Sequence, residues 1–90
     1  MDVEWDPAKA RANFLKHGVE FSEAAVAIED PRSRHQPDPD AEGERRYIAL
    51  GLDGLGRALL AVYAYRGEAV RIISARKASK QERAQYEAFL

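Results

Sequence analysis

Residues 46–75, RYIALGLDGLGRALLAVYAYRGEAVRIISA, decide the fold of this chain. Three runs in this segment, at 46–52, 57–65 and 69–75, are rich in aliphatic, β-branched and aromatic residues, as strands are. The separating segments DGLG and RGE are short and contain glycine, which is typical of hairpin turns. Strands joined by such short connections pair antiparallel, so the segment predicts a β-meander.

Two helices are predicted ahead of the meander. Asp6 and Pro7 have the residue types of an N-cap and a first helical position, and Gly18 is a suitable left-handed C-cap. A second helix is expected over residues 23–28, with Ser22 as its N-cap, and it ends before the Asp-Pro pair that follows.

The remaining segments complete the expected architecture. A capping-box signature, Ser79 with Glu82, predicts a closing helix that runs to the C-terminus. Residues 3–5 fit a short strand, and residues 31–44, rich in proline and acidic residues, fit a loop with a weak strand signal at 33–36. We therefore expect an α+β fold: a small antiparallel sheet of about three to five strands, with two N-terminal helices and one C-terminal helix.

Length and composition place the chain in a broad class. Ninety residues are expected to form one domain, residues 1–90, with a small core. The absence of cysteine excludes disulfides, zinc–thiolate sites and thiol nucleophiles. The N-terminus lacks the residue order of a secretion signal, and the apolar run at 58–65 is too short to cross a bilayer. We expect a cytoplasmic protein that has no membrane partner.

Charge is divided unevenly along the chain. Residues 1–45 contain six Lys or Arg and eleven Asp or Glu, a net charge of −5, whereas residues 46–90 contain eight and four, a net charge of +4. Such a division indicates either one surface for a polyanion and another for a different partner, or a solvated surface whose charge is uneven.

Arginines flank the last predicted strand, in VRIISARKAS at 70–79. In a regular strand Arg71 and Arg76 point to opposite faces, but a bulge or bend near the strand end would re-aim Arg76. A guanidinium at the rim of a sheet is suited to phosphate, which it binds in a planar fork. The alternative is that Arg76 pairs with Glu82 and fixes the closing helix.

Other basic and titratable residues extend this pattern. Arg66, Lys77 and Lys80 continue the basic segment on either side. His17, at the end of the first helix, can transfer protons near neutral pH or serve as a cation that suits the helix dipole. Tyr86 can present its hydroxyl, stack on a base or pack against the sheet. The sequence contains no phosphate-binding loop, nucleophile elbow or metal-ligand spacing.

Several segments together resemble the BrnT family, the toxins of type II toxin–antitoxin operons. They are WDPAKARANFLKHGVEF at 5–21, RYIALGL at 46–52, RIISARKAS at 71–79, and Glu82 with Tyr86. The resemblance covers nearly the whole chain apart from the loop after the second helix. It implies a RelE-like fold and a ribonuclease that stops translation by cutting RNA. It also implies a cognate BrnA-like antitoxin with a ribbon-helix-helix part, through which alone the complex binds promoter DNA.

Cleavage of RNA without a metal ion or other cofactor needs a base for the ribose 2′-hydroxyl, cations for the phosphorane charge and an acid for the leaving oxygen. The candidate catalytic residues are Arg66, Arg71, Arg76, His17 and Tyr86. The candidate contacts to the RNA backbone are Lys9, Lys16, Lys77 and Lys80. The proton-transfer role stays open among His17, Lys16 and Tyr86. Because no unmistakable catalytic pair is present, a non-catalytic module that binds RNA or protein is the second hypothesis.

Overall fold

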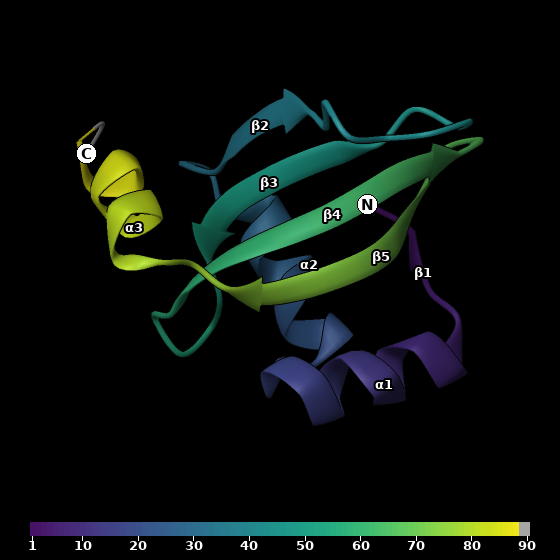
Figure 1. The fold of residues 1–90 in the computed structure, drawn as a ribbon, viewed down its shortest axis with the longest axis horizontal. Helices are drawn as coiled ribbons and strands as arrows, with labels where there is room; N and C mark the ends of the chain where they lie inside the picture. The colour runs from purple at the N-terminus through teal and green to yellow at the C-terminus, as the bar shows by residue number, and fades with distance from the viewer. Residues whose placement is uncertain (89–90) are drawn as a thin grey trace.

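The fold is a single mixed sheet with three helices around it (Figure 1). The structure is a computed structural model and describes residues 1–88. Its elements are β1 (Val3–Glu4), α1 (Pro7–His17), α2 (Phe21–Glu29), β2 (Arg34–Pro37), β3 (Tyr47–Leu52), β4 (Ala58–Arg66), β5 (Ala69–Lys77) and α3 (Lys80–Glu87). The strand order is β1-β5-β4-β3-β2. The predicted α+β class and the meander of β3, β4 and β5 are confirmed.

The sheet is antiparallel from β2 to β5, but β1 joins it parallel to β5. The N–H of Val70 donates a hydrogen bond to the carbonyl of Asp2 across this junction. A parallel pair requires a long connection, and here both N-terminal helices and three strands separate β1 from β5. The expectation of a purely antiparallel sheet therefore holds for four of the five strands.

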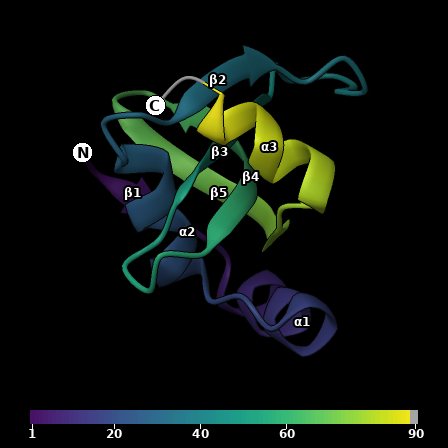
Figure 2. The same ribbon diagram turned by 90° about the vertical axis from the view of Figure 1, so that its left-hand side faces the viewer.

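The helices lie on different sides of the sheet. α2 covers one face, α3 stands at one end of the opposite face, and α1 runs along the free edge of β5 (Figure 2). The core lies between α2 and the sheet, and its largest fully buried side chains are Val19, Phe21, Leu59 and Ile72. Most of the opposite face is left open by the helices.

The start of α2 differs from its prediction. The helix begins at Phe21 and its N-cap is Glu20, not Ser22. The carboxylate of Glu23 accepts a hydrogen bond from the Glu20 N–H at 2.8 Å, which is one half of a capping box. Because Phe21 is buried in the core as the first helical residue, the helix must start there to present it. The predicted ends of α1 are confirmed: Asp6 caps its start and Gly18, at φ 70°, its end.

A β-bulge in β5 changes the direction of its last side chains. Val62 of β4 pairs with Ser74 and Tyr63 pairs with Ile72, so Ile73 is an extra residue without an opposite partner. The bulge shifts the alternation by one position. Arg71, opposite Ala64, and Arg76, opposite Leu60, therefore lie on the same open face of the sheet. The strand is therefore not regular, and the bulge re-aims Arg76 as the alternative considered for this strand allowed.

Asn13 holds α1 against the free edge of β5. Its Oδ1 accepts a hydrogen bond from the Ala75 N–H at 3.0 Å, and its Nδ2 donates to the Ala75 carbonyl at 2.8 Å and the Val19 carbonyl at 3.2 Å. The amide thus replaces a neighbouring strand at this position of the sheet edge. Asn13 is buried, although the helical pattern alone places it on a polar face of α1.

Candidate functional site

Two rows of side chains cross the open face of the sheet. Arg34 of β2, Leu50 of β3, Leu60 of β4 and Arg76 of β5 are successive cross-strand partners and form the first row. The neighbouring row consists of Gln36, Ile48, Val62 and Ser74. Each row has an aliphatic centre and polar ends. The two arginines of the first row are three strand spacings apart, which is about 14 Å between backbones.

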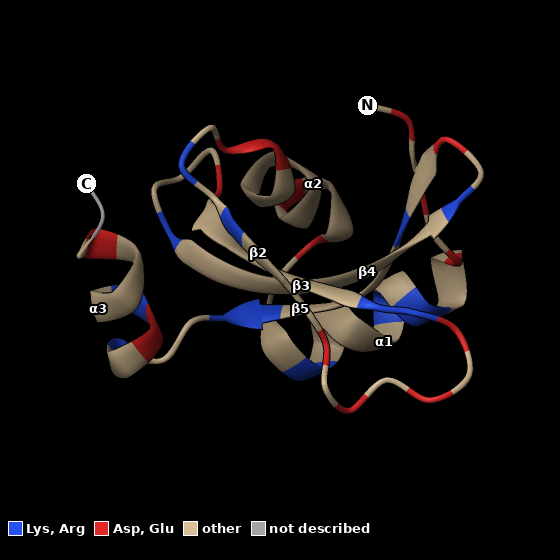
Figure 3. Ribbon diagram, turned by 90° about the horizontal axis from the view of Figure 1, so that it is seen from above, with Lys and Arg blue, Asp and Glu red and all other residues tan. Residues whose placement is uncertain are grey.

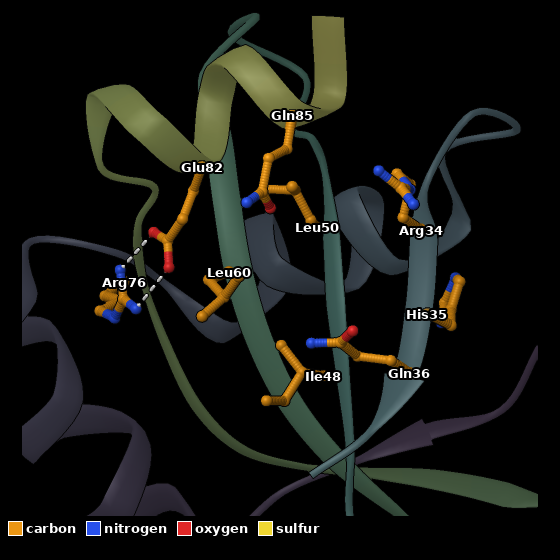
Figure 4. Close-up of a pocket in the computed structure, with 9 residues that line it drawn as sticks. All are labelled: Arg34, His35, Gln36, Ile48, Leu50, Leu60, Arg76, Glu82 and Gln85. Atoms are coloured by element: carbon orange, nitrogen blue, oxygen red, sulfur yellow. Dashed lines mark hydrogen bonds and ion pairs between the residues drawn. The ribbon is translucent and has the colours of Figure 1, made fainter. Parts of the chain in front are cut away.

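α3 turns this face into a groove. Glu82 and Gln85 project from α3 over the end of the sheet, and Ile48, Leu50 and Leu60 form the floor (Figure 4). The groove has a volume of about 290 Å³, and its lining consists of Arg34, His35, Gln36, Ile48, Leu50, Leu60, Arg76, Glu82 and Gln85. A flat aliphatic floor framed by cations and amides can accept a planar group that carries negative charge nearby.

Arg76 and Glu82 form a two-pronged ion pair at one side of the groove. Nη1 of Arg76 donates to Oε1 of Glu82 at 2.8 Å, and Nη2 donates to Oε2 at 3.0 Å. The hydrogen bonds from Arg76 lower the pKa of Glu82 to about 2, against the opposing effect of burial. Glu82 also accepts the Ser79 N–H at 2.8 Å, as the predicted capping box requires. The guanidinium therefore has a fixed position, yet its side chain remains 43% exposed to solvent.

More cations lie where β5 leads into α3. A second hollow, about 600 Å³, lies under α3 and is lined by Arg57, Lys77 and Arg83 among other residues. Arg57 is paired with Asp53 and Glu23, whereas within residues 1–88 no ion pair involves Lys77 or Arg83. The end of β5 and the start of α3 thus carry unneutralised positive charge beside the groove (Figure 3).

Comparison with known proteins identifies the family. The family model for the ribonuclease toxin BrnT of type II toxin–antitoxin systems matches residues 5–82. The chain belongs to the BrnT family. The fold is also similar to the crystal structure of the Brucella abortus ribonuclease toxin BrnT, with a TM-score of 0.66 and 25% sequence identity over 89% of this chain and 99% of that one. A search of curated protein sequences finds no match. As members of a type II toxin family, BrnT-family chains are paired with an antitoxin.

Two of the arginines predicted for the BrnT-family site lie away from the groove. Arg66, at the end of β4, forms an ion pair with Glu44 in the loop before β3. Arg71 pairs with Glu4 of β1 at 3.2 Å. In register, Arg71 lies four residue positions along the sheet from Arg76, which is about 13 Å. The three predicted arginines therefore do not converge on one phosphate.

Several ion pairs join the acidic half of the sequence to the basic half. Glu4, Glu23 and Glu44 belong to the acidic half of the chain, and each pairs with an arginine of the basic half. These ion pairs thus neutralise part of the charge of each half. The acidic loop between β2 and β3 lies at the opposite end of the sheet from α3 (Figure 3). The basic residues near α3 are consequently separated from the acidic residues of this loop.

The predicted α1 residues are distributed over both ends of the molecule. Asn13 contacts Ala75, so Lys16 and His17, one turn further along α1, lie at the end of β5 that leads to α3 (Figure 1). Lys9 lies in the first turn of α1, toward β1. Lys16 and His17 thus lie at the same end of the sheet as Lys77 and Lys80, while Lys9 lies toward the other end.

Tyr86 is buried and attaches α3 to the rest of the fold. Its hydroxyl donates a hydrogen bond to Asp30 at the end of α2. Burial and this hydrogen bond raise the pKa of Tyr86 to about 12. Asp30 also accepts the Leu52 N–H at 2.9 Å. The hydroxyl therefore faces the protein rather than the groove, as in the packing alternative considered for this residue.

Arg34, Gln36 and Gln85 line the groove but are not among the site residues predicted from the sequence. Arg34 and Gln36 lie in a strand whose sequence signal is weak, and their position opposite Leu50 and Ile48 follows only from the register. His35, between them, points to the α2 side, where Nδ1 contacts the Tyr63 hydroxyl and Nε2 the Ser33 hydroxyl, both at 2.7 Å. Alternation in β2 therefore places an amide and a guanidinium on the groove face and the imidazole on the opposite face.

Within residues 1–88, no group of three or more His, Asp or Glu side chains is placed to hold a metal ion. None of the helices in this part of the chain is long and apolar enough to span a membrane.

Proposed function

We propose that this BrnT-family chain is an endoribonuclease that cleaves RNA without a metal ion and thereby inhibits translation in the cytoplasm. The observation that carries the proposal is the fixed guanidinium of Arg76 at the rim of a groove with an aliphatic floor. Family membership supports ribonuclease activity in general. A single RNA strand fits such a surface because its bases need apolar contacts and its phosphates need cations.

In the proposed reaction the ribose 2′-hydroxyl attacks the adjacent phosphorus and the 5′-oxygen of the next nucleotide leaves. The 2′-hydroxyl proton passes to a base and the leaving oxygen receives a proton, so the products are a cyclic phosphate and a free 5′-hydroxyl. Arg76 stabilises the charge that develops on the phosphorane. Glu82 acts as a positioning residue, because a carboxyl with a pKa of about 2 is a weak base at neutral pH. His17 and Lys16, at the same end of the molecule, are the proposed proton-transfer groups.

The antitoxin partner is proposed to be BrnA-like, with a ribbon-helix-helix part that alone contacts promoter DNA. A partner that covers the basic β5–α3 junction would block access of RNA to Arg76, Lys77 and Lys80. Charge complementarity favours an acidic or amphipathic antitoxin segment at this surface. Cleavage that continues at full rate with saturating antitoxin contradicts this part of the proposal.

The test is cleavage of RNA by the purified chain in the presence of EDTA. We expect cleavage to persist, and we expect Arg76→Ala to reduce the rate on the order of 100-fold. Arg45→Ala is the matched control, since Arg45 is an exposed arginine in the loop at the far end of the sheet. Circular dichroism is the check that each variant is folded. Intact RNA with and without added metal ions contradicts the enzymatic proposal.

The second candidate function is a non-catalytic module that binds RNA or protein, and the same ion pairs support it. Each predicted catalytic arginine has a carboxylate partner, as a clamp that only holds RNA or protein would also have. In that case Arg76→Ala weakens RNA binding and no product appears with any variant. The cleavage assay therefore separates the two candidates.

A further inference from the structure

We propose that the groove between α3 and the open sheet face holds one unpaired nucleobase and reads its edge with the amides of Gln36 and Gln85. The base that fits best is adenine. The proposal rests on the proposed function only in taking RNA as the ligand. It assigns a specificity role to two residues that do not take part in the bond-breaking step.

The floor of the groove suits a flat ring. Leu50 and Leu60 are direct cross-strand partners, and Ile48 is the neighbour of Leu50 in the next row, so three aliphatic side chains lie side by side. Leu60 and Ile48 remain partly exposed although both are fully apolar. A nucleobase that lies on this floor removes apolar surface from water on its own face and on the protein.

Two amides point over this floor from different elements. Gln85 extends from α3 toward Leu50, and Gln36 extends from β2 toward Ile48 and Leu60 (Figure 4). Neither side-chain amide has a hydrogen-bond partner among residues 1–88. Both are therefore available to a ligand, whereas the nearby fork of Arg76 is engaged by Glu82.

The chemistry of an amide selects the base. A glutamine side chain presents one acceptor next to two donors, so it pairs in a bidentate way with a base edge that has a donor beside an acceptor. Adenine offers this pattern on two edges, since its amino group lies between two ring nitrogens. One adenine can thus satisfy one amide on its Watson–Crick edge and another on its Hoogsteen edge, whereas guanine, cytosine and uracil have no donor beside an acceptor on the Hoogsteen edge. Arg34 and Arg76, about 14 Å apart at the ends of the row, favour the phosphates on either side.

The test measures binding of the full chain to four fluorescent decanucleotides that differ at one central base, A, C, G or U, in an otherwise uridine sequence. All riboses are 2′-O-methylated, which blocks cleavage and makes binding independent of catalysis. We expect the adenine oligonucleotide to bind on the order of 10-fold more tightly than the others. Gln36→Met and Gln85→Met, which keep the side-chain length, are expected to reduce this preference to within about 2-fold while preserving uridine binding.

The control is Gln81→Met, an exposed glutamine of α3 that does not line the groove. It is expected to keep the full adenine preference. Equal binding of all four oligonucleotides by the parent chain, or an unchanged preference in both groove variants, overturns the inference. Because binding is measured on uncleavable RNA, an adenine preference without cleavage refutes the enzymatic proposal alone, and cleavage without preference refutes this inference alone.

Discussion

Substitution of Asn13 tests how strongly α1 is held on the edge of β5, because this one side chain makes three hydrogen bonds to backbone groups. Replacing Asn13 by alanine leaves the N–H and carbonyl of Ala75 and the carbonyl of Val19 without these partners. A buried backbone group that loses its only partner costs about 1–3 kcal/mol. We therefore expect the free energy of unfolding to fall by about 3–5 kcal/mol, which is a large part of the stability of a small domain.

The assay is equilibrium unfolding in urea, followed by circular dichroism, with the midpoint and slope fitted for each variant. A loss of about 3 kcal/mol corresponds to a decrease of about 12–24 °C in the thermal midpoint of a domain this size. Asn13→Asp, which keeps an acceptor for the Ala75 N–H but loses both donors, should be at least as unstable as Asn13→Ala. Arg11→Ala, at an exposed position of the same helix, serves as the control and should change stability by less than about 0.5 kcal/mol.

A decrease below about 1 kcal/mol for Asn13→Ala, with an unchanged slope, would refute the reasoning. It would mean that water replaces the amide at the edge of β5 without cost. The variant also separates stability from chemistry, since Asn13 does not line the groove.

Three further changes are expected to alter stability. Glu82→Gln should lower the free energy of unfolding by about 1–2 kcal/mol at pH 7, less than the full pKa shift implies because solvent screens the partly exposed ion pair. The pKa of Glu82 is about 2 in the folded protein and 4.5 ordinarily, so the stability difference between the parent and Glu82→Gln should be complete above about pH 4.5. It should shrink as the pH falls toward 2, and urea unfolding at pH 7 and pH 3 measures this change. Gly51→Ala would place its Cβ 2.2 Å from a carbonyl oxygen of α2 and should cost more than about 2 kcal/mol, whereas Gly54→Ala meets nothing within 4 Å and is the control; equal midpoints would contradict this. Tyr86→Phe removes the hydrogen bond to Asp30 and should cost about 1.5–3 kcal/mol in thermal or urea unfolding, and an unchanged midpoint would show that α3 is held by other contacts.

The sequence was sufficient for the elements whose signals are local. The meander follows from three apolar runs and two glycine turns, and the caps at Asp6, Gly18 and Ser79 act within a few residues of themselves. The N-cap of α2 was misplaced because Ser22 is a stronger intrinsic cap than Glu20, and burial of Phe21 overrides that preference. Local preference thus yields to the core where the two disagree.

The site was less predictable, because it depends on register and on pairs distant in sequence. The pairing of Arg76 with Glu82, which the sequence allowed as an alternative, is present, but the sequence did not indicate that Arg71 would pair with Glu4 at the other end of the strand. The role of Gln36 depends on which residue of β3 it faces, and a two-residue slip in pairing would move it along the groove. Long-range pairing, rather than residue type, therefore decides which polar side chains meet.

The bulge at Ile73 has a consequence for relatives of different length. Removal of one residue at this position would leave a regular strand in which Ala75 still faces α2 and Arg76 still faces the groove. An insertion between Ser74 and Arg76 would instead turn the guanidinium into the core. A one-residue difference in length is thus tolerated at Ile73, whereas one between Ser74 and Arg76 reverses the direction of the Arg76 side chain.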